Sequence, residues 1–303
     1  MLINHTVPAD YENTRLDRYL KKLYPHLIQS RIQKALRKGL IKVDQKRVEA
    51  DHRVSSGAVI SIDKFLTIDE SPEKSKAVKA PKEVSDKKAK FLLDSILYQN
   101  EDIIIINKPI GIAVQGGSKV QMSLDDMLPA LQFNATEAPK LVHRLDKDTS
   151  GVLVLARTHQ AAVRLSAMFK KDQVDKTYLA VCVGKPKRNK GVIDMPIEVM
   201  GQKKDAKTLF NVLDHYGNDL SLIEFKPVTG RKHQIRIHAS RALNTPILGD
   251  GKYGGESAFV DGLNIKLHLH ARNIKLMDKT LIDITAPIFP HMKETFRILG
   301  FTL

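Results

Sequence analysis

The chain has 303 residues, and the 42% of them that are hydrophobic are enough to build a core, which excludes wholesale disorder. Lys and Arg number 49 against 34 Asp and Glu, so the net charge is +15 and a polyanion, above all nucleic acid, is the expected partner. The single cysteine, Cys182, excludes an internal disulfide framework and a cysteine-rich zinc site.

Membrane and targeting signals are missing from the sequence. It contains no apolar run of about 18 residues that would span a bilayer, and its first residues have neither the apolar core of a secretory signal nor the Arg and Ser richness of a transit peptide. We therefore expect a protein of the reducing cytoplasm with no membrane partner.

The composition divides the chain into three parts. Residues 66–91 are rich in Lys, Glu, Ser, Asp and Pro and poor in aromatic residues, which predicts a charged flexible linker. This linker separates a small domain, residues 1–65, from a large one, residues 92–303. The small domain has 13 Lys and Arg against 7 Asp and Glu, so attraction to phosphates is expected to concentrate there.

The small domain is predicted to contain two helices and a small sheet. Apolar residues recur at helical spacing over residues 16–23. A second helix is predicted to begin with Ser30 as its N-cap and to end at Gly39. Alternation of apolar and polar residues over 40–44 and 58–63 predicts short strands.

Basic side chains follow one face of the second predicted helix. Arg31, Lys34 and Lys38 share this face, and with Ser30 they form a candidate surface for RNA phosphates. The alternative is that the row is only a solvated helix face, and helical geometry alone does not decide between the two.

The large domain is predicted to open with a buried strand. Four isoleucines, residues 103–106, precede the turn NKPIG, residues 107–111. Neither GxxxxGK(S/T) nor GxGxxG occurs in the chain, so we expect no nucleotide cofactor.

Reactive side chains are concentrated in VHRLDKDTSG, residues 142–151, just before an apolar strand at 152–156. A carboxylate such as that of Asp146, close to the guanidinium of Arg144, can serve as a nucleophile, a base or an anion-binding group. The alternative is a polar turn in which an aspartate caps backbone N–H groups.

Two later segments have a similar character. Residues 175–183 predict a strand that contains Tyr178, and a tyrosine in a strand ordinarily packs in the core. In TGRKHQIRIH, Thr229 is predicted to be the N-cap of a helix that places His233 and Arg236 on one face.

Histidines occur as two close pairs, His233 with His238 and His268 with His270. Neither pair is accompanied by a cysteine or by a set of converging carboxylates, which are the ligands that would complete a metal centre. The sequence therefore predicts no metal site.

Taken together, these segments resemble the RluA-type RNA pseudouridine synthases. The resemblance spans residues 95–303 and lies in NKPxG at 107–111, HRLDxxTSG at 143–151, KxYxAxxV at 176–183 and TGRxHQIRxH at 229–238. Residues 13–64, upstream, resemble the S4 RNA-binding domain in the order of three segments, LDRYL, SR…KGLIKVDQKRV and V…G. This resemblance implies that the second helix lies against structured RNA.

The resemblance implies roles for four residues. Asp146 matches the catalytic aspartate, which is required to break the bond between ribose C1′ and uracil N1 and to rejoin C1′ to C5. Arg236 would pair with that aspartate and hold it charged and oriented. Tyr178 would stack on the uracil and is a candidate base for the C5 proton, and Arg144 would replace the extruded nucleotide. The further motif residues expected to contact RNA are His143, Arg231 and His233.

The expected fold is α+β, an S4-like domain followed by a synthase domain with a largely antiparallel mixed β-sheet flanked by helices. The resemblance implies isomerisation of uridine in 23S-type ribosomal RNA or a pre-ribosomal particle, by a monomer without cofactor or metal. AVQGGS, residues 113–118, resembles the branch that modifies several uridines near the peptidyl-transferase centre, although that branch commonly has His in place of Gln115. The alternatives are the same chemistry on transfer RNA and a non-catalytic RNA-binding ribosome-assembly factor.

Overall fold

The computed structural model describes residues 2–67, 86–116, 122–199 and 201–303. It divides into two compact units, Met1–Ala80 and Pro81–Leu303. Most of the predicted linker, and part of the segment AVQGGS, lie outside the described residues.

The described ends of the predicted linker are helical rather than flexible. Helix α3 spans Lys64–Thr67 and helix α4 spans Asp86–Leu93. Leu66 is buried in the core of the first unit and Leu92 in a core of the second, so each helix is held by an apolar side chain. The expectation of a flexible chain up to residue 91 is therefore wrong at α4.

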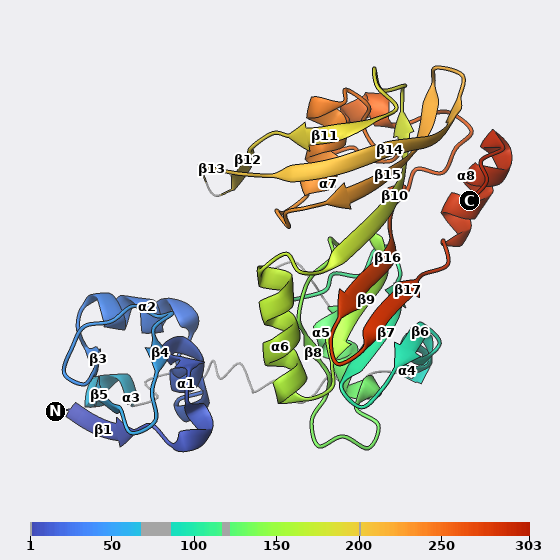
Figure 1. Ribbon diagram of the computed structural model, residues 1–303. Helices are drawn as coiled ribbons and strands as arrows, with labels where there is room; N and C mark the ends of the chain where they lie inside the picture. The colour runs from blue at the N-terminus through green and yellow to red at the C-terminus, as the bar shows by residue number, and fades with distance from the viewer. Residues whose placement is uncertain (1, 68–85, 117–121, 200) are drawn as a thin grey trace. The chain divides into compact units, whose positions relative to one another are not determined.

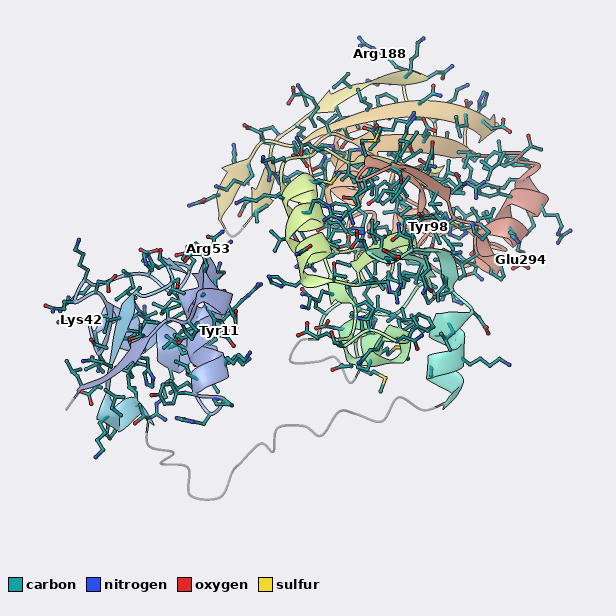
Figure 2. The ribbon with its side chains drawn as sticks, turned by 60° about the horizontal axis from the view of Figure 1, so that its bottom comes forward. Tyr11, Lys42, Arg53, Tyr98, Arg188 and Glu294 are labelled. Atoms are coloured by element: carbon teal, nitrogen blue, oxygen red, sulfur yellow. The ribbon has the colours of Figure 1, made fainter. Side chains whose placement is uncertain are left out.

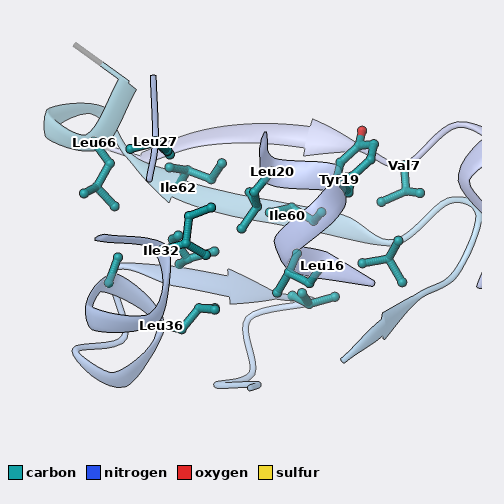
Figure 3. Close-up of a cluster of buried hydrophobic side chains, with 14 residues drawn as sticks. Val7, Leu16, Tyr19, Leu20, Leu27, Ile32, Leu36, Ile60, Ile62 and Leu66 are labelled. Carbon is teal, nitrogen blue, oxygen red and sulfur yellow. The ribbon is translucent and has the colours of Figure 1, made fainter. Parts of the chain in front are cut away.

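The first unit is a small sheet covered by two helices. Its three-stranded antiparallel sheet has the order β1-β5-β3, and a two-stranded sheet pairs β2 with β4. Leu16 and Leu20 of α1 meet Ile32 of α2 and Ile60 of β5 in the core (Figure 3). The elements are β1 Leu2–Thr6, a 3-10 helix Ala9–Tyr11, β2 Thr14–Arg15, α1 Leu16–Leu23, α2 Gln29–Arg37, β3 Ile41–Val43, β4 Arg53–Val54 and β5 Val59–Asp63.

Helix α2 begins two residues before the predicted position. Its N-cap is Ile28, and Ser30 lies exposed in the first turn without a capping hydrogen bond. The Gln29 side chain donates to a carboxylate oxygen of Asp17 at 2.8 Å, and that oxygen also accepts from Arg15 at 2.8 Å. This link between α1 and α2 fixes Gln29 in the helix, so the predicted capping role of Ser30 is wrong.

The second unit is built on one large sheet (Figure 1). The strand order is β11-β14-β15-β10-β16-β9-β7-β6, with β17 paired to β16 and β8 paired to β9. All neighbours are antiparallel except β16 and β9. The strands are β6 Ile96–Gln99, β7 Ile103–Lys108, β8 Lys140–Leu141, β9 Ser150–Ala156, β10 Asp175–Val183, β11 Lys190–Asp194, β14 Lys207–Tyr216, β15 Leu220–Pro227, β16 Leu269–Met277 and β17 Leu281–Thr285, and a separate hairpin pairs β12 Ile197–Val199 with β13 Gln202–Lys204.

Helices cover both faces of the β7–β9 part of the sheet. Ile104 and Ile106 pack with α5, whereas Ile103 and Ile105 pack in the cluster that includes Leu165 of α6. The predicted α+β class with a largely antiparallel mixed sheet is therefore confirmed. The helices are α5 Leu124–Met127, α6 His159–Lys170, α7 Gln234–Ile237 and α8 Pro290–Leu299, with 3-10 turns at Leu128–Leu131 and Gly255–Ala258 and a π-helical turn at His238–Ala242. No helix among the described residues is long and apolar enough to cross a bilayer.

The parallel junction at the centre of the sheet requires a glycine. His270 and Ala271 of β16 pair with Ser150 and Gly151 of β9. Gly151 has φ +110, and a Cβ placed there would collide with the carbonyl of Ala271. The glycine of the HRLDxxTSG motif is thus the point at which the segment with Asp146 is joined to the sheet.

Buried histidines stabilise this region as neutral rings. His268 hydrogen-bonds to the Lys266 carbonyl at 2.7 Å and to the Thr295 hydroxyl at 2.8 Å, and His270 hydrogen-bonds to the Ser150 hydroxyl at 2.9 Å. Burial lowers the pKa of each ring to about 4. Among the described residues no group of three or more His, Cys, Asp or Glu is placed to hold a metal ion.

These rings predict a loss of stability in mild acid. Unfolded histidine has a pKa of about 6.5, so as the pH falls from 6.5 towards 4 the unfolded state binds protons that the folded state does not. We expect the free energy of unfolding to drop by about 2 kcal/mol for each of His268 and His270 between pH 7.5 and about pH 5. Denaturant unfolding at a series of pH values measures this. Replacing exposed His159 with Gln should leave the dependence unchanged, and a stability that is equal at both pH values would contradict the prediction.

Candidate active site

A cavity of about 400 Å³ opens in the second unit where its motifs meet. Its walls come from residues 142–149, α6 and the start of β10, the turn after β15, and Leu269. Seven of the predicted site residues line it, whereas the four predicted in the first unit, Ser30, Arg31, Lys34 and Lys38, belong to α2 and its C-cap. The seven are His143, Arg144, Asp146, Tyr178, Arg231, His233 and Arg236.

The Asp146 loop is fixed by its own backbone and by the strand that follows it. The carbonyl of Asp146 accepts a hydrogen bond from the N–H of Thr149 at 3.1 Å, and Leu145 is buried in the core. Ser150 then begins β9 and is held by His270. The Asp146 side chain is 17% exposed, so it faces the cavity while its backbone is rigidly attached to the sheet.

His143 is held by protein contacts within the cavity wall. Its Nε2 accepts a hydrogen bond from the N–H of Val154 at 2.8 Å, and its ring stacks on Phe169 with 4.1 Å between centroids. Burial, and then the charge of Lys176, lower its pKa to about 3, so the ring is neutral. Arg144 is exposed at the cavity, and within the described residues it makes no hydrogen bond or ion pair.

Arg236 contacts a different carboxylate from the one predicted. Its Nε and Nη2 donate to the two oxygens of Asp250 at 2.8 and 2.6 Å, and Asp250 is only 1% exposed. Burial lowers the pKa of Arg236, but the hydrogen bonds and charge of Asp250 outweigh it and leave the pKa raised. The predicted direct pairing with Asp146 is therefore wrong in this structure, because the deeply buried carboxylate of Asp250 accepts from both Nε and Nη2 of Arg236.

The helix that contains Arg236 also begins later than predicted. α7 starts at Gln234, its N-cap is His233 with φ 57, and Thr229 is no cap. The Thr229 hydroxyl instead donates to Oε1 of Gln234 at 2.8 Å, and the Gln234 amide donates to the carbonyl of Lys207 at 2.9 Å. Gln234 thereby ties the turn to β14, which the spacing of the motif did not predict.

His233 is the basic side chain that contacts Asp146. Its Nε2 lies 3.5 Å from Oδ1 of Asp146, and its Nδ1 hydrogen-bonds to the hydroxyl of Tyr253 at 2.7 Å. Tyr253 follows Asp250 in the segment GDGKYGG, whose side chains the sequence analysis gave no role. This segment, residues 249–255, also resembles a later signature of the RluA-type synthases, and that likeness was the only signal that the sequence offered for either residue.

Tyr178 provides an aromatic surface within the cavity. Burial, and then the charge of Asp146, raise the pKa of its phenol. A phenol with a raised pKa remains protonated at neutral pH, so Tyr178 is suited to stacking on a base and is not a resident phenolate.

Lys108 of NKPIG is a site residue that the sequence analysis missed. It is fully buried, and its ammonium donates to the carbonyls of Pro109, Ile112 and Lys147 at 2.8, 3.1 and 3.1 Å. The N–H of Gly111 donates to the same Lys147 carbonyl at 2.9 Å. Burial lowers the pKa of Lys108 to about 7, against the opposing charges of Asp148 and Asp146. The NKPIG turn therefore fastens the residue after Asp146 in place.

Replacing Lys108 with Met tests this fastening. Met fills similar volume but removes three hydrogen bonds, and the carbonyl of Lys147 keeps only the N–H of Gly111, so we expect the free energy of unfolding to fall by about 2 kcal/mol. Lys147→Met is the matched control, because that side chain is exposed and only its backbone carbonyl is used. Denaturant unfolding compares the two variants, and equal stabilities would show that Lys108 does not hold the loop.

Known proteins share both units of this chain. The family model for RNA pseudouridylate synthase matches residues 102–241, and the model for the S4 domain matches residues 14–60. A protein of Rickettsia felis named ribosomal large subunit pseudouridine synthase C is 41% identical over 292 residues, covering 92% of each chain, and one of Vibrio vulnificus with the same name is 31% identical, covering 97% of this chain and 95% of its own.

Solved structures agree with these matches. The structure titled human RNA pseudouridylate synthase domain containing 4 is 30% identical with a TM-score of 0.63, covering 71% of this chain and 96% of its own. The predicted S4 domain and the predicted synthase family are thus both confirmed, and this chain belongs to the RNA pseudouridylate synthase family.

Proposed function

We propose that this chain isomerises uridine to pseudouridine in large-subunit ribosomal RNA, with Asp146 as the catalytic carboxylate. The observation that carries the proposal is the cavity that exposes one Asp146 carboxylate beside Tyr178 and His233. Relatives that match more than nine-tenths of the chain are named as large-subunit synthases, which supports this choice of RNA. The proposal includes no cofactor and no metal, and places a monomer in the cytoplasm.

The cavity suits a single flipped nucleoside. A base inside a stacked helix cannot present C1′ and C5 to a carboxylate, so the uridine has to be extruded. The cavity, about 400 Å³, falls in the range of small-molecule sites. The exposed guanidinium of Arg144 is available to fill the space that the nucleotide leaves, and Arg231 lines the same cavity.

The reaction needs no outside group to balance. The C1′–N1 bond breaks, C1′ bonds to C5 of the same uracil, and the proton of C5 is lost while N1 gains one. Asp146 is the group placed to act at the sugar or the ring. Tyr178 supplies an aromatic surface on which the detached uracil stacks while it turns, and this stacking keeps the uracil from leaving. The phenol of Tyr178 stays neutral, because its pKa is raised.

Tritium release tests the reaction. We expect release from 23S-type RNA labelled with tritium at uridine C5, with no cofactor added, and none from labelled transfer RNA. Asp146→Asn should reduce the rate at least about 1,000-fold while RNA affinity stays within about threefold, because the amide keeps the shape but loses the charge.

Each other result assigns a different function. Release from transfer RNA alone would show that the substrate is transfer RNA and not large-subunit ribosomal RNA. Release from neither RNA nor from pre-ribosomal particles would leave a non-catalytic RNA-binding factor. A loss of affinity in Asp146→Asn as large as its loss of rate would make Asp146 a structural residue.

The first unit is proposed to bind RNA through α2. Arg31, Lys34 and Lys38 lie on the side of α2 away from the buried Ile32 and Leu36. Further basic side chains, those of Lys42 and Arg53, project from the outside of this unit (Figure 2). The basic face of α2 suits the phosphates and 2′-hydroxyls through which RNA helices are recognised.

Salt dependence tests that surface. Changing Arg31, Lys34 and Lys38 together to Gln should reduce the slope of log affinity against log salt by about 2 between 50 and 200 mM, since each lost phosphate contact removes about 0.7 to 0.9. The charge-preserving set Arg31→Lys, Lys34→Arg and Lys38→Arg should keep the slope. An unchanged slope in the Gln variant would show that this face of α2 is only solvated.

A further inference from the structure

We propose that His233 is a positioning residue for Asp146, with Tyr253 holding the histidine ring in place. In this arrangement Nε2 of His233 fixes Oδ1 of Asp146, and the second carboxylate oxygen is left for the uridine. The proposal rests on the proposed function, because it assigns a role toward the carboxylate that the reaction uses.

The backbone of His233 is held in a costly conformation. Its φ of 57 lies in the left-handed region, which residues with a Cβ adopt uncommonly and at a cost of order 1 kcal/mol or more. The turn is held by Gln234, whose amide group hydrogen-bonds to Thr229, Arg231 and β14. Such strain persists only where surrounding contacts impose it, and here it aims the imidazole at Asp146.

The contacts of the two ring nitrogens favour one tautomer. Nε2 faces a carboxylate oxygen, which would repel an unprotonated nitrogen, so we assign the ring proton to Nε2 and the hydrogen bond at Nδ1 to donation by the Tyr253 hydroxyl, whose pKa burial raises. A neutral imidazole that accepts at Nδ1 has its proton on Nε2, and Nε2 is the atom that faces Asp146. The separation of Nε2 and Oδ1, 3.5 Å, is at the outer limit of a hydrogen bond, and catalytic hydrogen bonds of this length in free enzymes often tighten when substrate binds.

Burial, together with nearby positive charges, keeps the His233 ring neutral at physiological pH. Burial lowers the pKa of His233, the charge of Asp146 opposes this, and the charges of Arg236, Lys252 and Lys232 lower it further. A neutral donor holds the carboxylate in place without cancelling its charge.

Arg236 is engaged with another carboxylate. Its Nε and Nη2 donate to Asp250, and its guanidinium lies 5.2 Å from the centre of the Tyr253 ring. His233 is therefore the side chain that reaches Asp146, and Tyr253 is packed between the two basic groups.

The first test replaces His233 with Asn, which tolerates a positive φ but is too short to reach Asp146. We expect kcat for tritium release to fall about 10- to 100-fold, the effect of one hydrogen bond to a charged group, while KM stays within about threefold. His233→Gln, whose amide N–H extends further, should recover part of the loss. His215→Asn is the matched control on exposed β14, outside the cavity, and should keep full activity.

The second test removes only the hydroxyl of Tyr253. Tyr253→Phe keeps the ring beside Arg236, so we expect kcat to fall about 3- to 10-fold because the imidazole loses its orienting partner. The double variant, His233→Asn with Tyr253→Phe, should be no slower than His233→Asn alone, because Tyr253 acts through His233. A residue that only supports the fold would give losses that multiply, and would lower the thermal midpoint in proportion.

The outcomes separate this proposal from the proposed function. Absence of tritium release by the unsubstituted protein overturns the function. Release by the unsubstituted protein together with full activity of His233→Asn overturns only the role of His233, as do multiplying losses in the double variant. A loss confined to KM would reassign His233 to RNA binding.

Discussion

The close approach of β9 and β16 at Gly151 is the constraint on which the site depends. The two central strands run parallel there, and the space between Gly151 and the Ala271 carbonyl admits no side chain. The reactive segment leaves the sheet at this junction, so the position of Asp146 is set by main-chain packing in the most buried part of the unit. A catalytic carboxylate requires such rigidity, because small displacements of a reacting group are costly in rate.

The segment with Asp146 has a second support, which comes from residues that precede it in the chain. Lys108 at the end of β7 places a buried ammonium against three carbonyls, one of them that of Lys147. Burying an amino group is costly, and the cost is offset only where its hydrogen bonds are satisfied. The segment with Asp146 is thus held by β9 on one side and by the NKPIG turn on the other, which explains why this distant motif belongs to the site.

The sequence predicted what periodicity and local chemistry determine. The buried strands at 103–106 and 152–156 and the α1 helix were placed correctly, because apolar runs act over short distances. The residues that line the cavity around Asp146 and Tyr178 were suggested by the family resemblance, since a strand tyrosine taken alone predicts core packing. Contacts made across the fold were not predictable in this way. The start of α2 depends on Gln29 reaching Asp17, and the partner of Arg236 is chosen by burial. Neither effect is encoded in local spacing.

The pairing of Arg236 with Asp250 has a chemical consequence for Asp146. A direct bidentate bridge from arginine would place a donor on each oxygen of the catalytic carboxylate and so take up part of its capacity to accept hydrogen bonds. With Nε and Nη2 bonded to Asp250, Arg236 contributes positive charge near Asp146. His233 approaches Asp146 through Nε2, which lies 3.5 Å from Oδ1. The site therefore separates charge balance from hydrogen bonding, so that Asp146 is held in place while one of its oxygens remains open to the uridine.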